Sequence, residues 1–328
     1  MSNEHDVRTR VWRNGIVEAD DFPFEQISDY LEQPDCLVWA DICAPDQRRL
    51  NALAEELSLD PHAVEDAVEH HERPKASRYA THLFLSAYDL QFDRESGELT
   101  ATQVAAFVLR NAVVTVRQSE DISLDPVVAA WDANADLIRF GAKALVYGLL
   151  DVLVDGHSTA LEALDDEIEK IEDILFEETR ATVRQVQIRS YALRKSLVKA
   201  RRAILPMREL VNSVMRRVDD VHPELEPYYD DLYDHVVRAT EWTESLRDMV
   251  SSIFETNLSL ADSRLNTVMK KLTAWAAIIA VPTAVTGFYG QNVPYPGFAA
   301  HWGFWVSTVV MVVCAVGLYA IFRRRDWI

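Results

Sequence analysis

Two long runs of apolar residues stand at the C-terminal end of the chain, whereas the residues before them mix apolar and charged positions. The runs cover residues 272–289 and 302–322, and an uncharged polar segment, residues 290–301, joins them. Each run approaches the roughly 20 residues that a helix needs to cross about 30 Å of hydrocarbon. A core helix of a soluble protein rarely lacks a polar face over such a length. The pattern therefore predicts two transmembrane helices joined by a short loop.

Basic residues at the ends of the two runs predict their direction. Lys270 and Lys271 precede the first run, a basic tail at residues 323–328 follows the second, and the connecting segment has no Lys or Arg. The positive-inside rule then places both chain termini in the cytosol and residues 290–301 outside the cell. The first residues also lack the apolar core of a secretory signal. We expect a multi-pass protein of the cell membrane that contacts the lipid bilayer.

Residues 1–141 alternate between strand-like and helix-like patterns. Strands are expected at residues 36–42 and 81–92 and, as a pair with a tight turn, within residues 102–118. A helix is expected over residues 45–57, because Pro45 suits a helix start. The pattern predicts a cytosolic α/β domain with a sheet of several strands.

Long helical patterns follow in residues 142–271. Helices are expected over residues 143–176 and 182–219, and a third runs without an obvious breaker from residue 228 to Pro282. The predicted fold class is thus an α+β membrane protein. Its parts are a cytosolic α/β domain, a stalk or funnel of long helices, and two C-terminal transmembrane helices.

A polar stripe follows the last of these helices at alternating steps of four and three residues. This period of 3.5 places the positions on one side of a helix that packs in a left-handed bundle. The stripe one position earlier, from Phe254 to Ile279, is apolar. The members of the polar stripe are Glu255, Ser259, Asp262, Asn266, Met269, Thr273, Ala276, Ala280, Thr283 and Gly287.

The polar stripe favours a pore, but two helices alone enclose no channel. A pore therefore implies a ring of identical chains, with the first transmembrane helix of each copy at the axis. The alternative is a membrane anchor whose helices pack closely through small residues. That alternative does not explain why Asn266 lies in line with Glu255 and Asp262.

The charge balance excludes some classes of function. The net charge of −19 argues against a nucleic-acid-binding protein, which usually carries a basic surface. An acidic surface attracts cations, although it also serves solubility alone. The three cysteines form no CxxC pair, and the sequence shows no catalytic triad or nucleotide-binding loop. We therefore expect no enzyme.

The residues after the first apolar run resemble the signature of the CorA family of divalent-cation channels. That signature is Gly-Met-Asn, usually preceded by Tyr, and this chain has Tyr289, Gly290, Gln291 and Asn292. Three further segments are similar to the family, and the resemblance covers most of the chain. They are "HAVEDAVEHHERPK" (residues 62–75), "YYDDLYDH" (228–235) and "RDMVSSIFETNLSLADSRLNTVMKKLT" (247–273).

The resemblance implies a homopentamer that takes up Mg2+, often with Co2+ or Ni2+, through one pore on the five-fold axis. It implies no cofactor, with Mg2+ as both substrate and regulatory ligand. By position, Gly290 and Asn292 match the signature at the outer mouth, and Glu255 matches an acidic ring near the inner end. The family positions and the polar stripe together predict these pore-lining residues: Glu255, Asp262, Asn266, Met269, Leu272, Thr273, Ala280, Thr283 and Gly287.

Gln291 departs from the family signature, which usually has methionine there. One interpretation is a neutral replacement at a packing position, and the other is a second ring of amides that changes ion preference. A Zn2+-transporting branch also varies this position, so transport of Zn2+ or another transition metal stays open. A third hypothesis is a membrane-tethered scaffold without transport.

The family resemblance also implies that cytosolic Mg2+ closes the pore by binding between neighbouring copies. The matching carboxylates are Asp66 and Asp231, with Glu65 and Asp234 close by in the sequence. Because like charges repel across an interface, a divalent cation that bridges them stabilises the closed ring. The alternative for each residue is a solvated acidic surface.

Overall fold

The chain folds into two compact units, Met1–Ile253 and Phe254–Ile328, and helix α9 (Glu226–Tyr289) belongs to both. The computed structural model describes residues 7–45, 47–69, 73–175, 180–217, 222–291, 294, 297–298 and 300–328. Two units are a coarser division than the six segments expected from the sequence, and the finer boundaries stay predictions.

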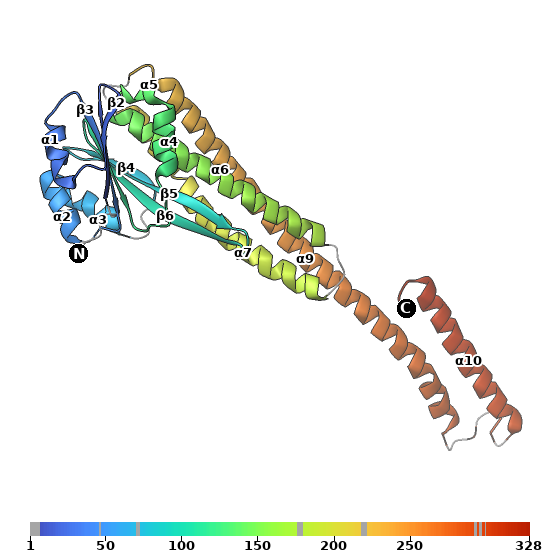
Figure 1. Ribbon diagram of the computed structural model, residues 1–328. Coiled ribbons are helices and arrows are strands. Elements are labelled where there is room, and N and C mark those ends of the chain that lie inside the picture. The colour runs from blue at the N-terminus through green and yellow to red at the C-terminus, as the bar shows by residue number, and fades with distance from the viewer. Residues whose placement is uncertain are drawn as a thin grey trace. The chain divides into compact units, whose positions relative to one another are not determined.

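A seven-stranded mixed sheet forms the centre of the first unit (Figure 1). Among the described pairings, β3 (Cys36–Cys43) with β7 (Ala112–Arg117) is parallel and the others are antiparallel. Both of these strands are buried along their whole length, which explains their nearly continuous apolar sequence. In spatial order the strands are β2 (Ile16–Asp20), β1 (Val7–Arg13), β3 (Cys36–Cys43), β7 (Ala112–Arg117), β6 (Glu98–Val108), β5 (Leu83–Asp93) and β4 (Lys75–Arg78).

Helices cover both faces of this sheet and make a three-layer α/β/α arrangement. Successive residues of β7 point to opposite faces, so Val113 joins one apolar core and Val114 the other. The helices of this unit before α9 are η1 (Phe24–Gln26), α1 (Ile27–Leu31), α2 (Gln47–Glu56), α3 (Pro61–Val68), α4 (Asp125–Ala133), α5 (Ala135–Ile138), α6 (Ala142–Leu175), α7 (Arg180–Ile204) and α8 (Met207–Arg217). The core around Val114 includes α2 and α3, and the core around Val113 includes α4, α6, α8 and the start of α9.

The long helices agree with the sequence pattern except at one proline. Helix α6 confirms the helix expected over residues 143–176. The single helix expected over residues 182–219 is wrong, because the chain turns at Leu205 and Pro206 between α7 and α8. Proline disfavours helical geometry in the residue before it and suits the start of a helix, where its carbonyl accepts from the amide of Glu209 (3.1 Å).

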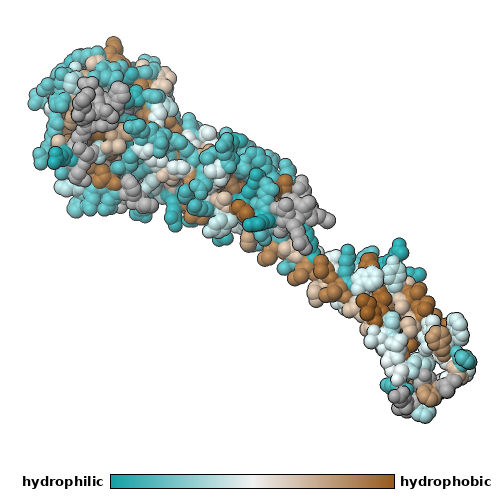
Figure 2. Space-filling model, turned by 60° about the horizontal axis from the view of Figure 1, so that its bottom comes forward, coloured by the Kyte–Doolittle hydropathy of each residue, from teal (hydrophilic) through white to brown (hydrophobic). Residues whose placement is uncertain are grey.

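The second unit contains the two apolar helices expected to span the membrane. Helix α9 continues through Pro282 to Tyr289, and α10 covers His301–Arg324. Both are long and apolar enough to cross a bilayer. Hydrophobic side chains gather on this part of the surface, whereas the first unit is mostly hydrophilic (Figure 2). The predicted fold class is thereby confirmed.

A glycine in α6 lets a tryptophan pack directly against the helix backbone. A Cβ atom on Gly148 would lie 2.6 Å from Cδ1 and Nε1 of Trp131. That indole cannot easily move, because its Nε1 donates to the carbonyl of Leu145 (3.1 Å) and its ring contacts Trp12 and Trp39 edge-on. The core therefore has no room for a methyl group at this position.

We expect Gly148→Ala to lower the free energy of unfolding by about 1–3 kcal/mol, the usual effect of overpacking a core. Gly156→Ala is the matched control in the same helix, because its nearest neighbour, Asp89 Oδ1, would lie 3.5 Å away. That control should gain about 0.5–1 kcal/mol from lower backbone entropy in the unfolded state. Thermal unfolding of the full-length variants in detergent measures both, and equal midpoints contradict the explanation.

Candidate functional site

The polar stripe of α9 lies on an exposed side of the helix in the single chain. All ten of its members, from Glu255 to Gly287, are exposed, and so is Leu272 on the neighbouring apolar stripe. Less exposed positions in the apolar part of α9 include Ala274, Ile278 and Val281. Each of these precedes a member of the stripe by two residues, which is about 200° around a helix. The stripe therefore points away from the most covered side of α9.

Threonine hydroxyls in this stretch donate their hydrogens inside the helix. Thr283 Oγ1 donates to the carbonyl of Ile279 (3.2 Å), and Thr286 Oγ1 donates to the carbonyl of Pro282 (2.8 Å). A hydroxyl that donates internally keeps its oxygen as an acceptor. The side of α9 that carries Thr283 thus offers acceptor oxygens, which suit the water molecules around a cation.

The signature residues stand where α9 ends. The amide of Gly290 donates to the carbonyl of Thr286 (2.8 Å), and the amide of Gln291 donates to the carbonyl of Phe288 (3.3 Å). A Cβ atom on Gly290 would lie 2.9 Å from the Thr286 oxygen, so a side chain there would force the turn to shift. Gln291 is exposed, whereas Asn292 lies outside the described residues, so its role stays a prediction.

In the first unit, helix α3 carries the predicted regulatory residues Glu65 and Asp66. The carboxylate of Asp66 is paired with Lys75, whose Nζ lies 2.8 Å from Oδ2, so its charge is already balanced in the single chain. Glu65 is more exposed, and its Oε2 lies 4.0 Å from Nδ1 of His62. A cation that approaches α3 therefore meets Glu65 with less competition from a bound ammonium group.

The other predicted regulatory residues, Asp231 and Asp234, are exposed on the first turns of α9. Oδ2 of Asp231 lies 3.8 Å from Nε2 of His235. Within the part of one chain that the structure describes, no group of three or more His, Cys, Asp or Glu residues is arranged to hold a metal ion. The structure therefore does not unite the α3 and α9 carboxylates in one metal site of a single chain.

Two acidic residues of α6, Asp151 and Asp155, were not expected from the sequence to belong to the regulatory region, and the charge of Asp231 acts on Asp151. Burial raises the pKa of the half-buried Asp151, and the negative charges of Asp155 and Asp231 raise it further, whereas His235 lowers it. Burial likewise raises the pKa of the neighbouring Tyr147 hydroxyl. The available signal was the pair of aspartates four residues apart in an otherwise apolar stretch of α6.

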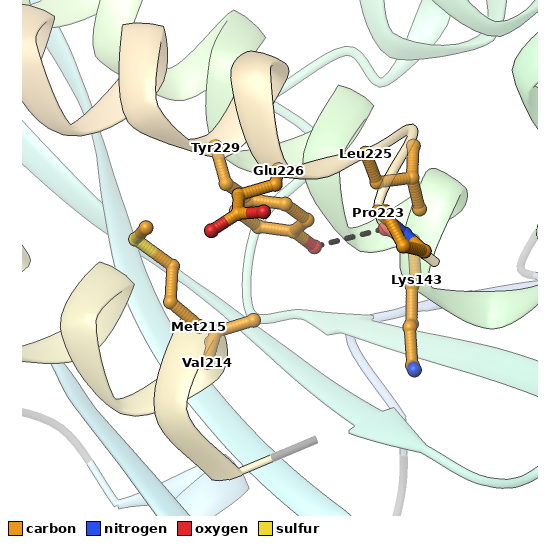
Figure 3. Close-up of a pocket in the computed structure, with 7 residues that line it drawn as sticks. All are labelled: Lys143, Val214, Met215, Pro223, Leu225, Glu226 and Tyr229. Atoms are coloured by element: carbon orange, nitrogen blue, oxygen red, sulfur yellow. Dashed lines mark hydrogen bonds between the residues drawn. The ribbon is translucent and has the colours of Figure 1, made fainter. Parts of the chain in front are cut away.

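A cavity of about 180 Å³ lies between α6, α8 and the start of α9 (Figure 3). The hydroxyl of Tyr229 donates to the backbone carbonyl of Lys143 at 2.9 Å, and burial raises the pKa of that hydroxyl. Glu226 is the one carboxylate in the lining, too few for a cation that prefers six oxygen ligands. The lining residues are Lys143, Val214, Met215, Pro223, Leu225, Glu226 and Tyr229.

Known proteins match this chain along most of its length. The family described as "CorA-like Mg2+ transporter protein" matches residues 35–324. The cobalt/magnesium transport protein CorA of Thermotoga maritima is 33% identical over 279 residues, which are 84% of this chain and 79% of that protein. The zinc transport protein ZntB of Yersinia enterocolitica is 23% identical over 311 residues, covering 90% of this chain and 89% of the relative.

The solved structure of the CorA magnesium transporter of Methanocaldococcus jannaschii has the same fold. It superimposes with a TM-score of 0.78 over 100% of both chains, at 22% sequence identity. That likeness concerns the whole chain, including the α/β domain, the long helix and the two apolar helices.

Proposed function

The chain belongs to the CorA-like Mg2+ transporter family, and from this premise we propose that it is a homopentameric channel that carries Mg2+ and Co2+ into the cell. The observation that carries the proposal is the polar stripe of α9, exposed in the single chain at a spacing of 3.5 residues. Five copies around one axis would enclose a pore lined by this stripe. The basic residues at both ends of the apolar hairpin support cytosolic N and C termini in the cell membrane.

The chemistry of the stripe suits a hydrated divalent ion. Mg2+ loses its water reluctantly and prefers six oxygen ligands. Rings of Asn292, Asn266 and Thr283 would accept hydrogen bonds from the water around the ion and would not need to remove it. Since these groups are neutral, they would also release the ion more readily than a carboxylate ring.

Uptake of ions by proteoliposomes that contain the purified full-length protein tests the proposal. We expect uptake of Mg2+ and Co2+ down their gradients, faster when the interior is negative. Ni2+ and Zn2+ should be measured in parallel, because the same architecture serves several divalent ions. Absence of uptake of all four ions would leave the membrane-tethered scaffold as the better explanation.

Gln291 supports a second candidate function, transport of Zn2+ or another transition metal. We expect Gln291→Met, which restores the usual family residue, to change the ratio of Mg2+ to Zn2+ uptake by up to about tenfold, or about 1.4 kcal/mol. Gln291→Leu is the control that removes the amide without adding a thioether. If neither variant changes the ratio, the residue is a neutral replacement and the second candidate loses its support.

We further propose that cytosolic Mg2+ closes the pore by bridging Glu65 and Asp66 of one copy and Asp231 and Asp234 of the next. Burial is the main cause of the raised pKa of Asp151, and the charge of Asp231 raises it further, so the two carboxylates interact and an ionised Asp151 adds negative potential beside Asp231. Loss of the bridging ion would leave these carboxylates to repel one another, which favours an open ring. Mg2+ is thus both the substrate and a regulatory ligand, and no further cofactor is proposed.

Asp151→Asn tests this arrangement. Since the pKa of Asp151 is raised in the folded protein, its contribution to stability is greatest below its unfolded value of about 3.9 and is lost as the pH rises through the folded value. At pH 7 the ionised group therefore opposes folding, and the amide should raise the unfolding temperature without Mg2+. It should also reduce the additional stabilisation by Mg2+.

Calorimetry of the full-length protein with and without Mg2+ measures both effects. Asp136→Asn on α5 is the control, because that carboxylate is exposed. The regulatory role of Asp151 is wrong if its variant keeps the full stabilisation by Mg2+.

A further inference from the structure

Helix α7 is basic along its whole length, although the chain as a whole is acidic. It contains eight Lys or Arg residues and no Asp or Glu, in a chain of net charge −19. The opposite holds for the second part of α6, where the stretch from Asp151 to Asp173 contains nine Asp or Glu residues and one Lys. The two helices pack together as an antiparallel pair in the same chain (Figure 1).

The buried side of each helix follows one regular spacing. The buried positions of α7 include Val186, Ser190, Leu193, Leu197, Ala200 and Ile204, and those of α6 include His157, Leu161, Leu164, Ile168, Ile171 and Leu175. Both sets repeat at steps of four and three residues, as expected of helices that pack along a shared seam. The buried sides of α6 and α7 therefore already pack against other parts of the same chain.

A second stripe with the same spacing lies on the opposite side of each helix, two residues before the buried one. The acidic stripe of α6 consists of Asp155, Thr159, Glu162, Asp166, Glu169 and Asp173, and the basic stripe of α7 consists of Arg184, Ile188, Tyr191, Lys195, Val198 and Arg202. All twelve residues are exposed in the single chain. Because two residues turn a helix by about 200°, neither stripe can join the seam that the pair already makes.

Large apolar side chains interrupt the basic stripe. Ile188 is 60% exposed, Tyr191 74% and Val198 41%. A helix side that serves solubility alone would not place three such residues in line, whereas a helix that docks against another uses this spacing. The feature indicates a partner helix that brings acidic groups.

We propose that the basic stripe of α7 docks antiparallel on the acidic stripe of α6 in a neighbouring copy of the chain. Both stripes span 19 residues, or about 27 Å, so they match in length. With their centres aligned, Asp155 meets Arg202, Glu162 meets Lys195 and Asp173 meets Arg184. The contact joins two different surfaces, the α7 stripe of one copy and the α6 stripe of the next. Such a heterologous contact is the type that closes identical chains into a ring. It rests on the ring assembly proposed above.

A second copy explains both stripes, whereas an anionic lipid surface explains only the basic one. Exposed ion pairs contribute about 0.2–1 kcal/mol each, so the three apolar residues must supply part of the attraction. Some stripe residues also have partners in their own chain, since Lys195 pairs with Glu98 (3.5 Å) and Arg94 with Asp166 (2.8 Å). Because the ion pairs between the two stripes are exposed, salt screens them, and we expect the contact to weaken as salt concentration rises.

Disulfide formation between two chains that each carry one introduced, exposed cysteine tests the contact, because the native Cys36 and Cys43 are buried. In a Cys314→Ser background, which removes the exposed native cysteine, chains with Lys195→Cys are co-expressed with chains carrying Glu162→Cys. Oxidation should give a covalent dimer of the two chains, and neither chain alone should give it. Partners with Asp155→Cys and Glu169→Cys cover a shift in register, and Asp136→Cys on α5 is the negative control.

Charge reversal gives the second measurement on the full-length protein. The double variant Arg184→Glu/Arg202→Glu should lose most of its oligomer at low salt on size exclusion, and adding Asp155→Lys/Asp173→Lys should restore it. An intact oligomer without any cross-link overturns the docking contact but leaves the proposed ring in place. A monomeric wild-type chain overturns both. Loss of binding to phosphatidylglycerol vesicles, without rescue by the acidic-side reversal, overturns the contact in favour of lipid.

Discussion

Asn292→Ala is expected to abolish Mg2+ uptake while the protein stays assembled in the membrane. In the proposed pentamer, five carboxamides at the outer mouth accept hydrogen bonds from the water around the ion. Methyl groups in their place offer no acceptor, so the ion would enter the pore with poorly held water. Removing the water altogether is prohibitive, because even a monovalent ion faces an idealised penalty of roughly 20 kcal/mol in a medium of low dielectric constant.

We expect Mg2+ flux into proteoliposomes to fall about 100-fold or more, which corresponds to at least about 2.7 kcal/mol in the barrier. A fluorescent Mg2+ indicator inside the vesicles measures the rate. Asn292→Gln is the matched control, because it keeps the amide and moves it by one methylene, so part of the flux should remain. Asn292→Asp should bind Mg2+ more tightly and release it slowly. Undiminished flux in the alanine variant would exclude Asn292 from the ion pathway.

Local patterns in the sequence predicted much of the fold, because they depend on residues close together in the chain. The apolar spacing of α6 and the continuous apolar run of β3 both correspond to elements in the structure. The parallel pairing of β3 with β7 could not be predicted in this way, since it joins residues more than 70 positions apart. The break between α7 and α8 follows from a local signal, Pro206, because proline disfavours helical geometry in the residue before it.

The candidate site was predictable to a different degree in each unit. The stripe of α9 follows from periodicity alone, and the structure adds that its members are exposed. The balance of charge at Asp66 depends on Lys75, which comes from another element. The raised pKa of Asp151 depends first on burial by the surrounding fold, then on Asp155, and least on Asp231 of α9. Single-sequence reasoning cannot place such partners. Their arrangement between copies rests on the proposed ring.

Arg117→Leu is expected to destabilise the first unit more than any other substitution considered. The guanidinium lies beside the fully buried carboxylate of Asp41, with Nε 2.9 Å from Oδ2. Asp41 also accepts from Thr115 Oγ1 (2.7 Å), its direct neighbour across the parallel β3–β7 pair. Leucine in place of Arg117 leaves an unpaired charge in the core, which usually lowers stability by about 3–5 kcal/mol. The free energy of unfolding of a whole domain is only about 5–15 kcal/mol, so this loss is a large part of it.

Arg8→Leu is the control, because it removes a guanidinium from an exposed ion pair with Asp125 (2.7 Å), and such pairs contribute little. Urea unfolding of the full-length variants in detergent should separate the two by a large difference in midpoint. The double variant Asp41→Asn/Arg117→Leu should recover most of the loss, since the buried charge is gone and an amide can still bond to Thr115. If the double variant is no more stable than Arg117→Leu, the loss comes from packing and not from an unpaired charge.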